Sequence, residues 1–530
     1  MIRAVDLLRT VAELHHFLRQ ARSGRSAKIA ASLGLNENDF FAEVGFVPTM
    51  GALHKGHLSL IQRARYENQV LVVSIFVNPL QFSPLEDFKQ YPRTLEQDQV
   101  LCRQAGVDAI FAPAAEALIP SDVVTQVVPP AAMTEVLCGR SRPGHFQGVA
   151  TIVLKLLHLV QPDRIYLGQK DAQQLAIVQR LVSDLSIPVE VVPCPIIRET
   201  NGLAYSSRNQ YLTPEQKEQA AVLYRSLYAA KNQFYKGDRT RQALMKIVES
   251  ELATTPAVEP EYIELVHPAS LAPLEIVEEV GLLAIAARVG DTRLIDNTRL
   301  YNRKPIVAID GPAGAGKSTV TRRVAQALGL LYLDTGAMYR AVTWLVLQSG
   351  LEVQDEVAIA QLVSQCHIEL LCNPIDKPPQ VLINGHEVTE AIRSLEVTAQ
   401  VSVISAQRAV RQGMVKQQQR YGQQGGIAVE GRDIGTHVFP DAELKIFLSA
   451  SAQERARRRH QELIAQGIES IGLGQLQRDI EERDRQDSTR NLAPLRKAPD
   501  AIEIQTDPLS VAEVTAQIVA LYHEQFSENN

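Results

Sequence analysis

The sequence predicts an α/β protein with two doubly wound parallel sheets, one in each half of the chain. Two separate series of short apolar runs, each followed by turn residues and a helical pattern, support this prediction. The length of 530 residues exceeds what one ordinary core accommodates. In addition, a phosphate-binding motif begins only at Val307, although such a motif usually follows the first strand of its own domain. We therefore expect a complete domain before it and place the boundary at 301–305, between units 1–302 and 303–530.

The first series of strands lies in the N-terminal unit. The expected strands are VGFVPT, QVLVVSIFVNP, DAIFAP, DRIYLGQ and VEVVPCPII, within a core of about residues 1–210. Residues 211–302 mix short helical pieces with alternating apolar and polar residues, which predicts a small α+β subdomain. The opening stretch MIRAVDLLRTVAELHHFLRQ contains Asp6 and Glu13, so we expect an amphipathic surface helix there rather than a signal peptide.

The second series lies in the C-terminal unit. Its expected strands are PIVAID, LLYLDT, GIAVEG, ELKIFLS and IEIQTD, with a segment inserted between the second and third at about residues 366–420.

Composition excludes several classes of protein. A net charge of -6 argues against a broad surface for duplex nucleic acid. The five cysteines contain no CxxC pair, which argues against a disulfide framework and a zinc site and indicates a reducing compartment. The longest apolar run, VLVVSIFV at 70–77, is long enough for a strand but not for a membrane span. We expect a cytoplasmic protein.

The phosphate-binding motif is GPAGAGKS, which matches G-x-x-x-x-G-K-[ST] between an apolar strand and a helix. Glycines allow backbone N–H groups to face the phosphates, Lys317 reaches the outer oxygens, and Ser318 supplies a ligand for Mg²⁺. A chance glycine-rich turn is the alternative, and the flanking strand and helix argue against it. The residues expected at ATP are Gly311, Gly314, Gly316, Lys317, Ser318 and Thr319.

Residues 304–525 resemble the cytidylate kinase family. The motifs are LDTGAMYR (333–340), the inserted segment around VLINGHEVTEAIRSLEVTAQ, EGRDIGT and RDRQDSTR (483–490). The resemblance implies an acceptor site for CMP or dCMP, with contacts to the ribose, the phosphate and the cytosine. Its residues are Tyr339, Arg340, Ser402, Arg411, Arg432, Asp433, Arg483, Asp487 and Arg490. A carboxylate such as Asp433 accepts from an exocyclic amine but repels the carbonyl of uracil, so it favours cytosine.

A basic run, Arg455 to Arg459, follows the strand ELKIFLS. We interpret it as a lid over the transferring phosphates, with a solvated basic face and an RNA contact as alternatives.

In the first half, FVPTMGALHKGHLSLIQRA carries two histidines three residues apart at the start of a helix. His54 and His57 would lie beside backbone N–H groups that bind anions and could donate to an α-phosphate. A metal site and a pair of core histidines are the alternatives.

Residues 1–302 resemble pantothenate synthetase, a family of HxGH nucleotidyltransferases with a Rossmann-like scaffold. The motifs are PTMGALHKGH, SIFVNPLQF, RPGHFQGVATIVLKLL, GQKDAQQ and YSSRN. The resemblance implies that pantoate and ATP form pantoyl adenylate, which β-alanine converts to pantothenate with release of AMP. The implied catalytic residues are His54, His57, Lys170, Ser206, Ser207 and Arg208. The implied ATP contacts are Pro48, Thr49, Met50, Gly56, Gly168 and Asp171, and Gln81 and Gln174 would contact pantoate.

Three further features bear on this half. Asp98, on a flap with YPRT, is a candidate magnesium ligand, with a surface acid as the alternative. Gln169 stands where the family usually has glutamate, and residues 21–44 are longer than the family needs.

We therefore predict a bifunctional enzyme that uses ATP and Mg²⁺ and acts on small molecules, without nucleic acid or membrane partners. We also expect a homo-oligomer formed through the N-terminal half. The alternative is an RNA-binding, synthetase-like module with the phosphate-binding loop as a switch, which would require a basic stripe that the first 300 or so residues lack.

Overall fold

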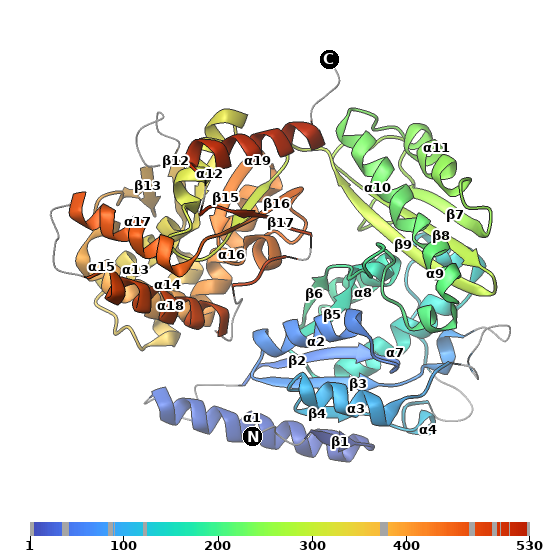
Figure 1. Cartoon of the computed structure of the whole chain (residues 1–530). Coiled ribbons are helices and arrows are strands. Elements are labelled where there is room, and N and C mark those ends of the chain that lie inside the picture. Colours follow the sequence, from blue (N-terminus) through green and yellow to red (C-terminus); the bar gives the residue numbers. More distant parts are fainter. Residues whose placement is uncertain are drawn as a thin grey trace. The chain divides into compact units, whose positions relative to one another are not determined.

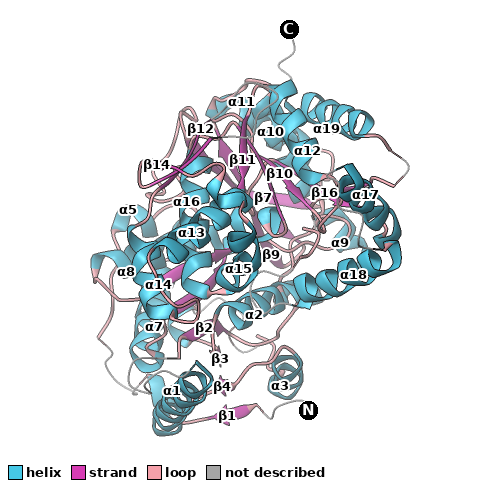
Figure 2. Cartoon of the chain, turned by 90° about the vertical axis from the view of Figure 1, so that its left-hand side faces the viewer, coloured by secondary structure: helices cyan, strands magenta, loops and turns pink. Residues whose placement is uncertain are grey.

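The computed structural model divides the chain into two compact units (Figure 1), Met1–Asn302 and Arg303–Ser527. It describes residues 5–33, 42–82, 88, 91–119, 125–371, 380–465, 472–489, 495–498, 500–507 and 509–526. Both units contain a parallel sheet covered by helices, which confirms the predicted fold class (Figure 2).

The N-terminal unit is built on a six-stranded sheet with the order β1-β4-β3-β2-β5-β6, in which all neighbours are parallel. The strands are β1 (Asp6–Leu8), β2 (Val44–Thr49), β3 (Val70–Ile75), β4 (Ala109–Phe111), β5 (Arg164–Gly168) and β6 (Glu190–Cys194). The central strands β2 and β3 are almost wholly buried, as their continuous apolar sequences predict.

Helices cover both faces of this sheet, and the buried apolar residues form a separate cluster on each face. They are α1 (Val11–Leu33), α2 (Lys55–Glu67), α3 (Leu95–Gln104), α4 (Ala115–Leu118), α5 (Ala131–Thr134), α6 (Cys138–Ser141), α7 (His145–Val160) and α8 (Ala172–Asp184). Helix α7 is mostly buried because its apolar residues extend around the helix.

The predicted small subdomain contains three helices and a three-stranded antiparallel sheet in the order β7-β8-β9. The elements are α9 (Pro214–Ala220), α10 (Val222–Tyr235), α11 (Arg241–Leu252), β7 (Val258–Val266), β8 (Val280–Val289) and β9 (Thr292–Tyr301).

The C-terminal unit is built on a five-stranded parallel sheet with the order β11-β15-β10-β16-β17. The strands are β10 (Val307–Asp310), β11 (Leu331–Asp334), β15 (Ile427–Gly431), β16 (Leu444–Ser449) and β17 (Ile502–Gln505). The helices are α12 (Lys317–Leu328), α13 (Thr335–Gln348), α14 (Glu356–Gln365), α17 (Ala452–Ala465), α18 (Leu473–Thr489) and α19 (Val511–Phe526).

An insertion between β11 and β15 has its own antiparallel sheet, β12-β13-β14. It contains β12 (Ile368–Leu371), β13 (Gln380–Ile383), β14 (His386–Glu387), α15 (Leu395–Ala406) and α16 (Arg408–Gln423). Its apolar residues share one core with α13 and α14.

One expectation changes at the N-terminus. The opening stretch is a short strand, β1, followed by the helix α1, whereas the sequence predicted only a helix. The strand was missed because it has only three residues and one of them is exposed. Helix α1 contains the first part of the long 21–44 segment, and residues 34–41 lie outside the described part of the chain.

The described cysteines, Cys102, Cys138, Cys194 and Cys366, are all free thiols. In the described part of the chain, no helix has the length and apolar character that a membrane span needs.

Candidate functional site

Most of the predicted residues of the N-terminal unit lie in segments that follow two neighbouring strands, β2 and β5. β2 and β5 are neighbours in the sheet. The strand that follows β2 in sequence, β3, lies on one side of this pair, whereas the strand that follows β5, β6, lies on the opposite side. Ligands of open α/β sheets bind where the strand order reverses in this way. The loop after β2 leads to His54, and the loop after β5 forms the short helix η2 (Gln169–Asp171).

The two histidines cap helix α2. The Nδ1 atom of His54 accepts a hydrogen bond of 3.1 Å from the N–H of Gly56, and the His54 N–H donates over 3.4 Å to Nδ1 of His57. The ring centroids are 4.0 Å apart. Since both Nδ1 atoms accept, each neutral ring carries its proton on Nε2, where it can be donated to a ligand.

Both histidines are held in the neutral form. Burial, together with the nearby charge of Lys170, lowers the pKa of His54 to about 4. Burial, with His54 and Lys170, also lowers the pKa of His57 well below its ordinary value. At neutral pH these side chains therefore provide hydrogen-bond donors without positive charge. No third metal-ligating side chain joins them among the described residues, which argues against the metal alternative.

The glycine between the histidines is required sterically. A Cβ atom at Gly56 would lie 2.9 Å from Cε1 of His54, so a side chain there would displace the imidazole.

Asp98 supports the preceding loop from the first turn of α3. Its carboxylate accepts from the N–H groups of Ala52 at 3.0 Å and Leu53 at 2.8 Å, and Oγ1 of Thr94 lies 3.2 Å away. Ala52 has a φ of 50°, an uncommon conformation for a residue with a side chain. Asp98 is 1% exposed, so the surface-acid interpretation is wrong. Because both of its oxygens accept from the protein, the structure favours a supporting role over the predicted magnesium ligand.

Helix η2 is held by strand β9 of the small subdomain. The side-chain amide of Asn297 donates to the carbonyl groups of Gln169 at 3.0 Å and Lys170 at 2.9 Å. The neighbouring Asp296 pairs with Arg198 at 2.5 Å. Asn297 and Asp296 were not among the predicted site residues, because no local motif marks a strand residue whose partners lie more than 90 positions away.

The predicted phosphate motif YSSRN lies at the short helix η3 (Ser207–Tyr211). Ser206 caps it by accepting from the N–H of Arg208 at 3.3 Å, and the hydroxyl groups of Ser207 and Tyr91 are 3.3 Å apart. Tyr205 stacks on His54 with ring centroids 6.3 Å apart, which connects this motif to the paired histidines.

A pocket of about 60 Å³ brings several predicted residues together. Those in its lining are Lys170, Asp171, Gln174, Ser206 and Arg208. The lining contains neither His54 nor His57, although the effect of Lys170 on both histidine pKa values shows that the two groups interact.

The remaining predicted residues of this half lie at the ends of strands β2 and β5 or in the segments that follow β2 and β3. Pro48 and Thr49 end β2, Met50 follows it, and Gly168 ends β5. Gln81 lies in the short helix η1 (Pro79–Gln81), where its amide donates to Sδ of Met50 at 2.9 Å.

In the C-terminal unit, the phosphate-binding loop follows the central strand β10, between β15 and β16. Gly311 has a φ of 152°, and a Cβ atom there would lie 2.2 Å from the carbonyl oxygen of Leu448. Gly314 and Gly316 also have positive φ values of 78° and 86°. Lys317 begins α12 and donates to the carbonyl group of Pro312 at 2.7 Å, so the loop is closed by its own lysine.

A buried carboxylate stands beside this loop at the end of β15. The hydroxyl of Ser318 donates to Oε2 of Glu430 at 2.7 Å, and the hydroxyl of Tyr332 donates to Oε1. Burial and the nearby Asp334 raise the pKa of Glu430. Hydroxyl and carboxylate oxygens are the ligands that Mg²⁺ prefers, and a cation would offset these crowded negative charges, so the residues fit the predicted ion. Glu430 was not among the predicted site residues, although a carboxylate at the end of an apolar strand, GIAVEG, was a usable signal.

Two predicted cytosine contacts, one in the inserted segment and one just after β15, form an ion pair. Arg411 of α16 pairs with Asp433 at 2.7 Å, and its guanidinium lies 5.8 Å from the ring centroid of Tyr339. Arg340 lies 3.7 Å from Asp334.

The other acceptor residues are placed less completely. Ser402 is exposed on α15, and Arg432 precedes Asp433 just beyond β15. The side chains of Arg483 and Asp487, and the whole of Arg490, lie outside the described part of the chain.

Asp310 connects the phosphate-binding loop to the acceptor loop, which is the segment after β15 that carries Arg432 and Asp433. It ends β10, directly before Gly311, and its two oxygens accept from the N–H groups of Ile434 at 2.8 Å and Gly435 at 2.7 Å. Burial raises the pKa of Asp310 to about 7, while these two hydrogen bonds lower it. Asp310 was not among the predicted site residues.

The arginines of the basic run on α17 bind different partners within the protein. Arg455 is 4% exposed, donates to the carbonyl group of Ala313 at 3.0 Å and pairs with Asp484. Arg458 donates to the carbonyl group of Thr506 at 2.7 Å. Arg455 therefore supports the phosphate-binding loop, which neither the lid nor the solvated-face interpretation predicted.

The comparisons with known proteins cover both units. A pantoate-beta-alanine ligase family model matches residues 7–299, and a cytidylate kinase family model matches residues 307–524. A bifunctional pantoate ligase/cytidylate kinase of Nostoc sp. is 59% identical over 98% of this chain and 99% of its own. One from Acaryochloris marina is 56% identical over 99% of each chain. The crystal structure of pantothenate synthetase from Thermus thermophilus is 44% identical, with a TM-score of 0.51, and covers 56% of this chain and 100% of its own.

Proposed function

The chain belongs to the family of bifunctional pantoate ligase/cytidylate kinases, and we propose from its two sites how it carries out both reactions. We assign ATP-dependent formation of pantothenate to residues 1–302 and phosphorylation of CMP or dCMP to residues 303–530. The observation that supports this assignment is the presence of two anion-binding loops, each at the carboxyl end of a separate parallel sheet.

In the first ligase step, the carboxylate of pantoate attacks the α-phosphorus of ATP. The new C–O–P bond forms as the bond to the bridging oxygen breaks, and pyrophosphate leaves with that electron pair. His54 and His57 donate from Nε2 to the phosphate as its charge rearranges, and they need not lose a proton to do so. Lys170, Ser206 and Arg208 bind the departing phosphates.

In the second step, the neutral amine of β-alanine attacks the acyl carbon of the adenylate. A C–N bond forms, AMP leaves with the electrons of the C–O bond, and the amine loses a proton to solvent. No side-chain nucleophile is required, because the adenylate is already activated.

In the kinase unit, the phosphate-binding loop and Lys317 hold the donor phosphates, and Asp433 with Arg411 selects the base. CMP attacks the γ-phosphorus in line, so that positioning and charge stabilisation provide most of the catalysis. Magnesium held through Ser318, with Glu430 beside it, would neutralise charge on the transferred group.

We further propose that the protein acts on these small molecules in the cytoplasm and forms a homo-oligomer through its ligase unit. Nucleotide accounting tests the assignment. With pantoate and β-alanine, ATP should yield AMP and pyrophosphate, whereas with CMP it should yield ADP and CDP. A chain that produced ADP in the first mixture, or no CDP in the second, would contradict it.

A further inference from the structure

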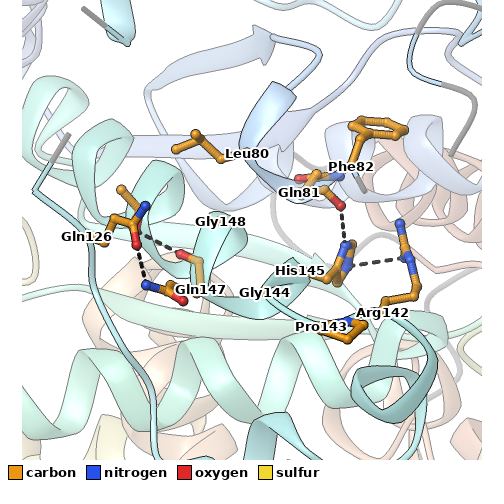
Figure 3. A pocket seen from close by; sticks show the side chains of 11 residues that line it. Leu80, Gln81, Phe82, Gln126, Arg142, Pro143, Gly144, His145, Gln147 and Gly148 are labelled. Atoms are coloured by element: carbon orange, nitrogen blue, oxygen red, sulfur yellow. Dashed lines mark hydrogen bonds between the residues drawn. The ribbon is translucent and has the colours of Figure 1, made fainter. Parts of the chain in front are cut away.

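A second pocket beside the ligase residues belongs to the ligase site. Its volume is about 240 Å³, and it lies between η1 and the first turn of α7 (Figure 3). Arg142 and His145 line both this pocket and the smaller pocket that contains Lys170, so the two pockets are continuous parts of one site.

In the kinase unit, a buried ion pair connects helices α17 and α18 to the phosphate-binding loop. Arg455 of α17 is 4% exposed, and both of its terminal nitrogens bind the carboxylate of Asp484 of α18, with 2.9 Å between Nη1 and Oδ1. Nη1 also donates to the carbonyl oxygen of Ala313 at 3.0 Å, and Nε donates to that of Ala450 at 3.1 Å. All three nitrogens of the guanidinium are therefore hydrogen-bonded, which fixes its position.

The bond to Ala313 sets the orientation of the phosphate-binding loop. A peptide unit is planar and trans, so the carbonyl of Ala313 and the N–H of Gly314 point in opposite directions. By holding the carbonyl, Arg455 also directs this N–H, which is one of the donors that a glycine-rich loop offers to phosphate. The arginine lies close against the loop, since a Cβ atom at Gly314 would be 3.4 Å from Cβ of Arg455.

Asp484 lies on the helix that carries most of the predicted acceptor motif. In α18, Arg483 directly precedes Asp484 and Asp487 follows it by three residues, and both are expected at CMP. Helices α17 and α18 lie side by side (Figure 2) and share a small apolar core of Ala456, Leu463 and Leu476. The ion pair therefore connects the acceptor helix to the loop that binds the donor.

We propose that Asp484 and Arg455 couple the binding of CMP to the binding of ATP. CMP fixes α18 through the acceptor motif, Asp484 then holds Arg455, and Arg455 holds the loop in the conformation that binds phosphate. Both are positioning residues, because they act on each other and on the backbone of the loop. By linkage, ATP strengthens the binding of CMP by the same factor. This inference rests on the proposed kinase activity and adds to it a route by which each substrate favours the other.

The test replaces Asp484 with asparagine (D484N) in the full-length protein. Asparagine has nearly the same size, but its amide group donates rather than accepts, so at least one bond to Arg455 is lost. The matched control is D479N, because Asp479 is an exposed acid on the same helix and binds Gln475. CMP is titrated in the presence of Mg²⁺, with and without saturating β,γ-imido-ATP, which cannot transfer its outer phosphate. The ligase reaction uses no CMP, so the titration reports on the kinase unit.

The ratio of the two Kd values for CMP measures the coupling. We expect the ATP analogue to tighten CMP binding to the wild type by about fivefold or more, a typical coupling between two sites. In D484N the ratio should fall to within about twofold of 1, while the Kd for CMP alone stays within about twofold of wild type. D479N should match the wild type in both quantities. A residue that only stabilised the fold would leave the ratio unchanged.

The arginine gives an independent test of the same link. R455K keeps the positive charge but loses the paired donors, and it should reduce the ratio by at least about half. In the double variant the ratio should be no lower than in D484N alone, because both changes break one connection. If D484N does not fold, R455K decides the question.

Three results would overturn the inference. A wild-type ratio within about twofold of 1 would show that the two sites are not coupled. A D484N or R455K ratio equal to that of the wild type would remove the ion pair from the coupling, and an equal loss in D479N would show a general charge effect on α18. Failure of the wild type to bind CMP would instead refute the proposed function, so the two failures are distinguishable.

Discussion

Replacement of Asp310 by asparagine tests how the kinase unit joins its two binding loops. The wild-type carboxylate accepts from Ile434 and Gly435, directly after the predicted base contact Asp433. Asparagine has a similar size but only one accepting oxygen, so its amide group would face a backbone N–H. Loss of one buried, charged hydrogen bond costs about 1.5–3 kcal/mol. If that free energy appears in the transition state for CMP phosphorylation, kcat/KM for CMP should fall about 10- to 150-fold.

The assay measures ADP formation against CMP and ATP concentrations separately. We expect the CMP dependence to change more than the ATP dependence, because the hydrogen bonds of Asp310 lie on the acceptor loop. Pantothenate formation by the same chain is an internal control and should be unaffected. A variant with kcat/KM for CMP within twofold of wild type would refute the reasoning, and so would an effect confined to ATP.

Three further substitutions test individual residues. Lys317→Ala should abolish CMP phosphorylation and leave pantothenate formation intact, and loss of both activities would contradict independent sites. His54→Ala should slow pantoate-dependent pyrophosphate release by about 10²- to 10³-fold, the usual effect of losing one such donor, and an unchanged rate would remove His54 from the mechanism. Asp433→Asn should narrow the preference for CMP over UMP by about 10-fold, the effect of a lost charged hydrogen bond, and an unaltered ratio of turnover would contradict its role in base selection.

The strands of both sheets were largely predictable from the sequence because most of their inner strands are buried on both faces. Such strands need continuous apolar runs, and β2, β3 and β10 have them. Strand β1 gave no such signal, since it lies at the edge of its sheet and pairs with β4 over only three residues.

The site was predictable where its residues lie within one motif, and unpredictable where they meet across the fold. The spacing of His54 and His57 already places both at one helix start. By contrast, Asn297 reaches η2 from a strand more than 120 residues later, and Asp98 supports its loop from a helix 45 residues away. These contacts depend on how elements pack, which no local pattern encodes. Asp98 also shows that an acid expected as a magnesium ligand or a surface group can be an internal acceptor.

Adenylate formation and CMP phosphorylation should respond differently to mild acid. A histidine with a lowered pKa serves the first reaction, whereas an aspartate with a raised pKa supports the second. His54 has a pKa of about 4, so it stays a neutral donor from pH 8 down to about pH 5. Asp310 has a pKa of about 7, raised by burial from its ordinary value, so it gains its proton as the pH falls through 7. Because the folded state binds this proton more tightly than the unfolded state, protonation of Asp310 stabilises the fold. This stabilisation is fully present below about pH 3.8 and is lost as the pH rises through about 7. It nevertheless weakens the acceptor for Ile434 and Gly435. CMP phosphorylation should therefore decline between pH 8 and pH 6 while adenylate formation persists, and Asp310→Asn should remove this difference. When both products are measured in one sample, the ratio of CDP to pyrophosphate should decrease as the pH is lowered from 8 to 6. A constant ratio would show that the ionisation of Asp310 does not control the acceptor loop.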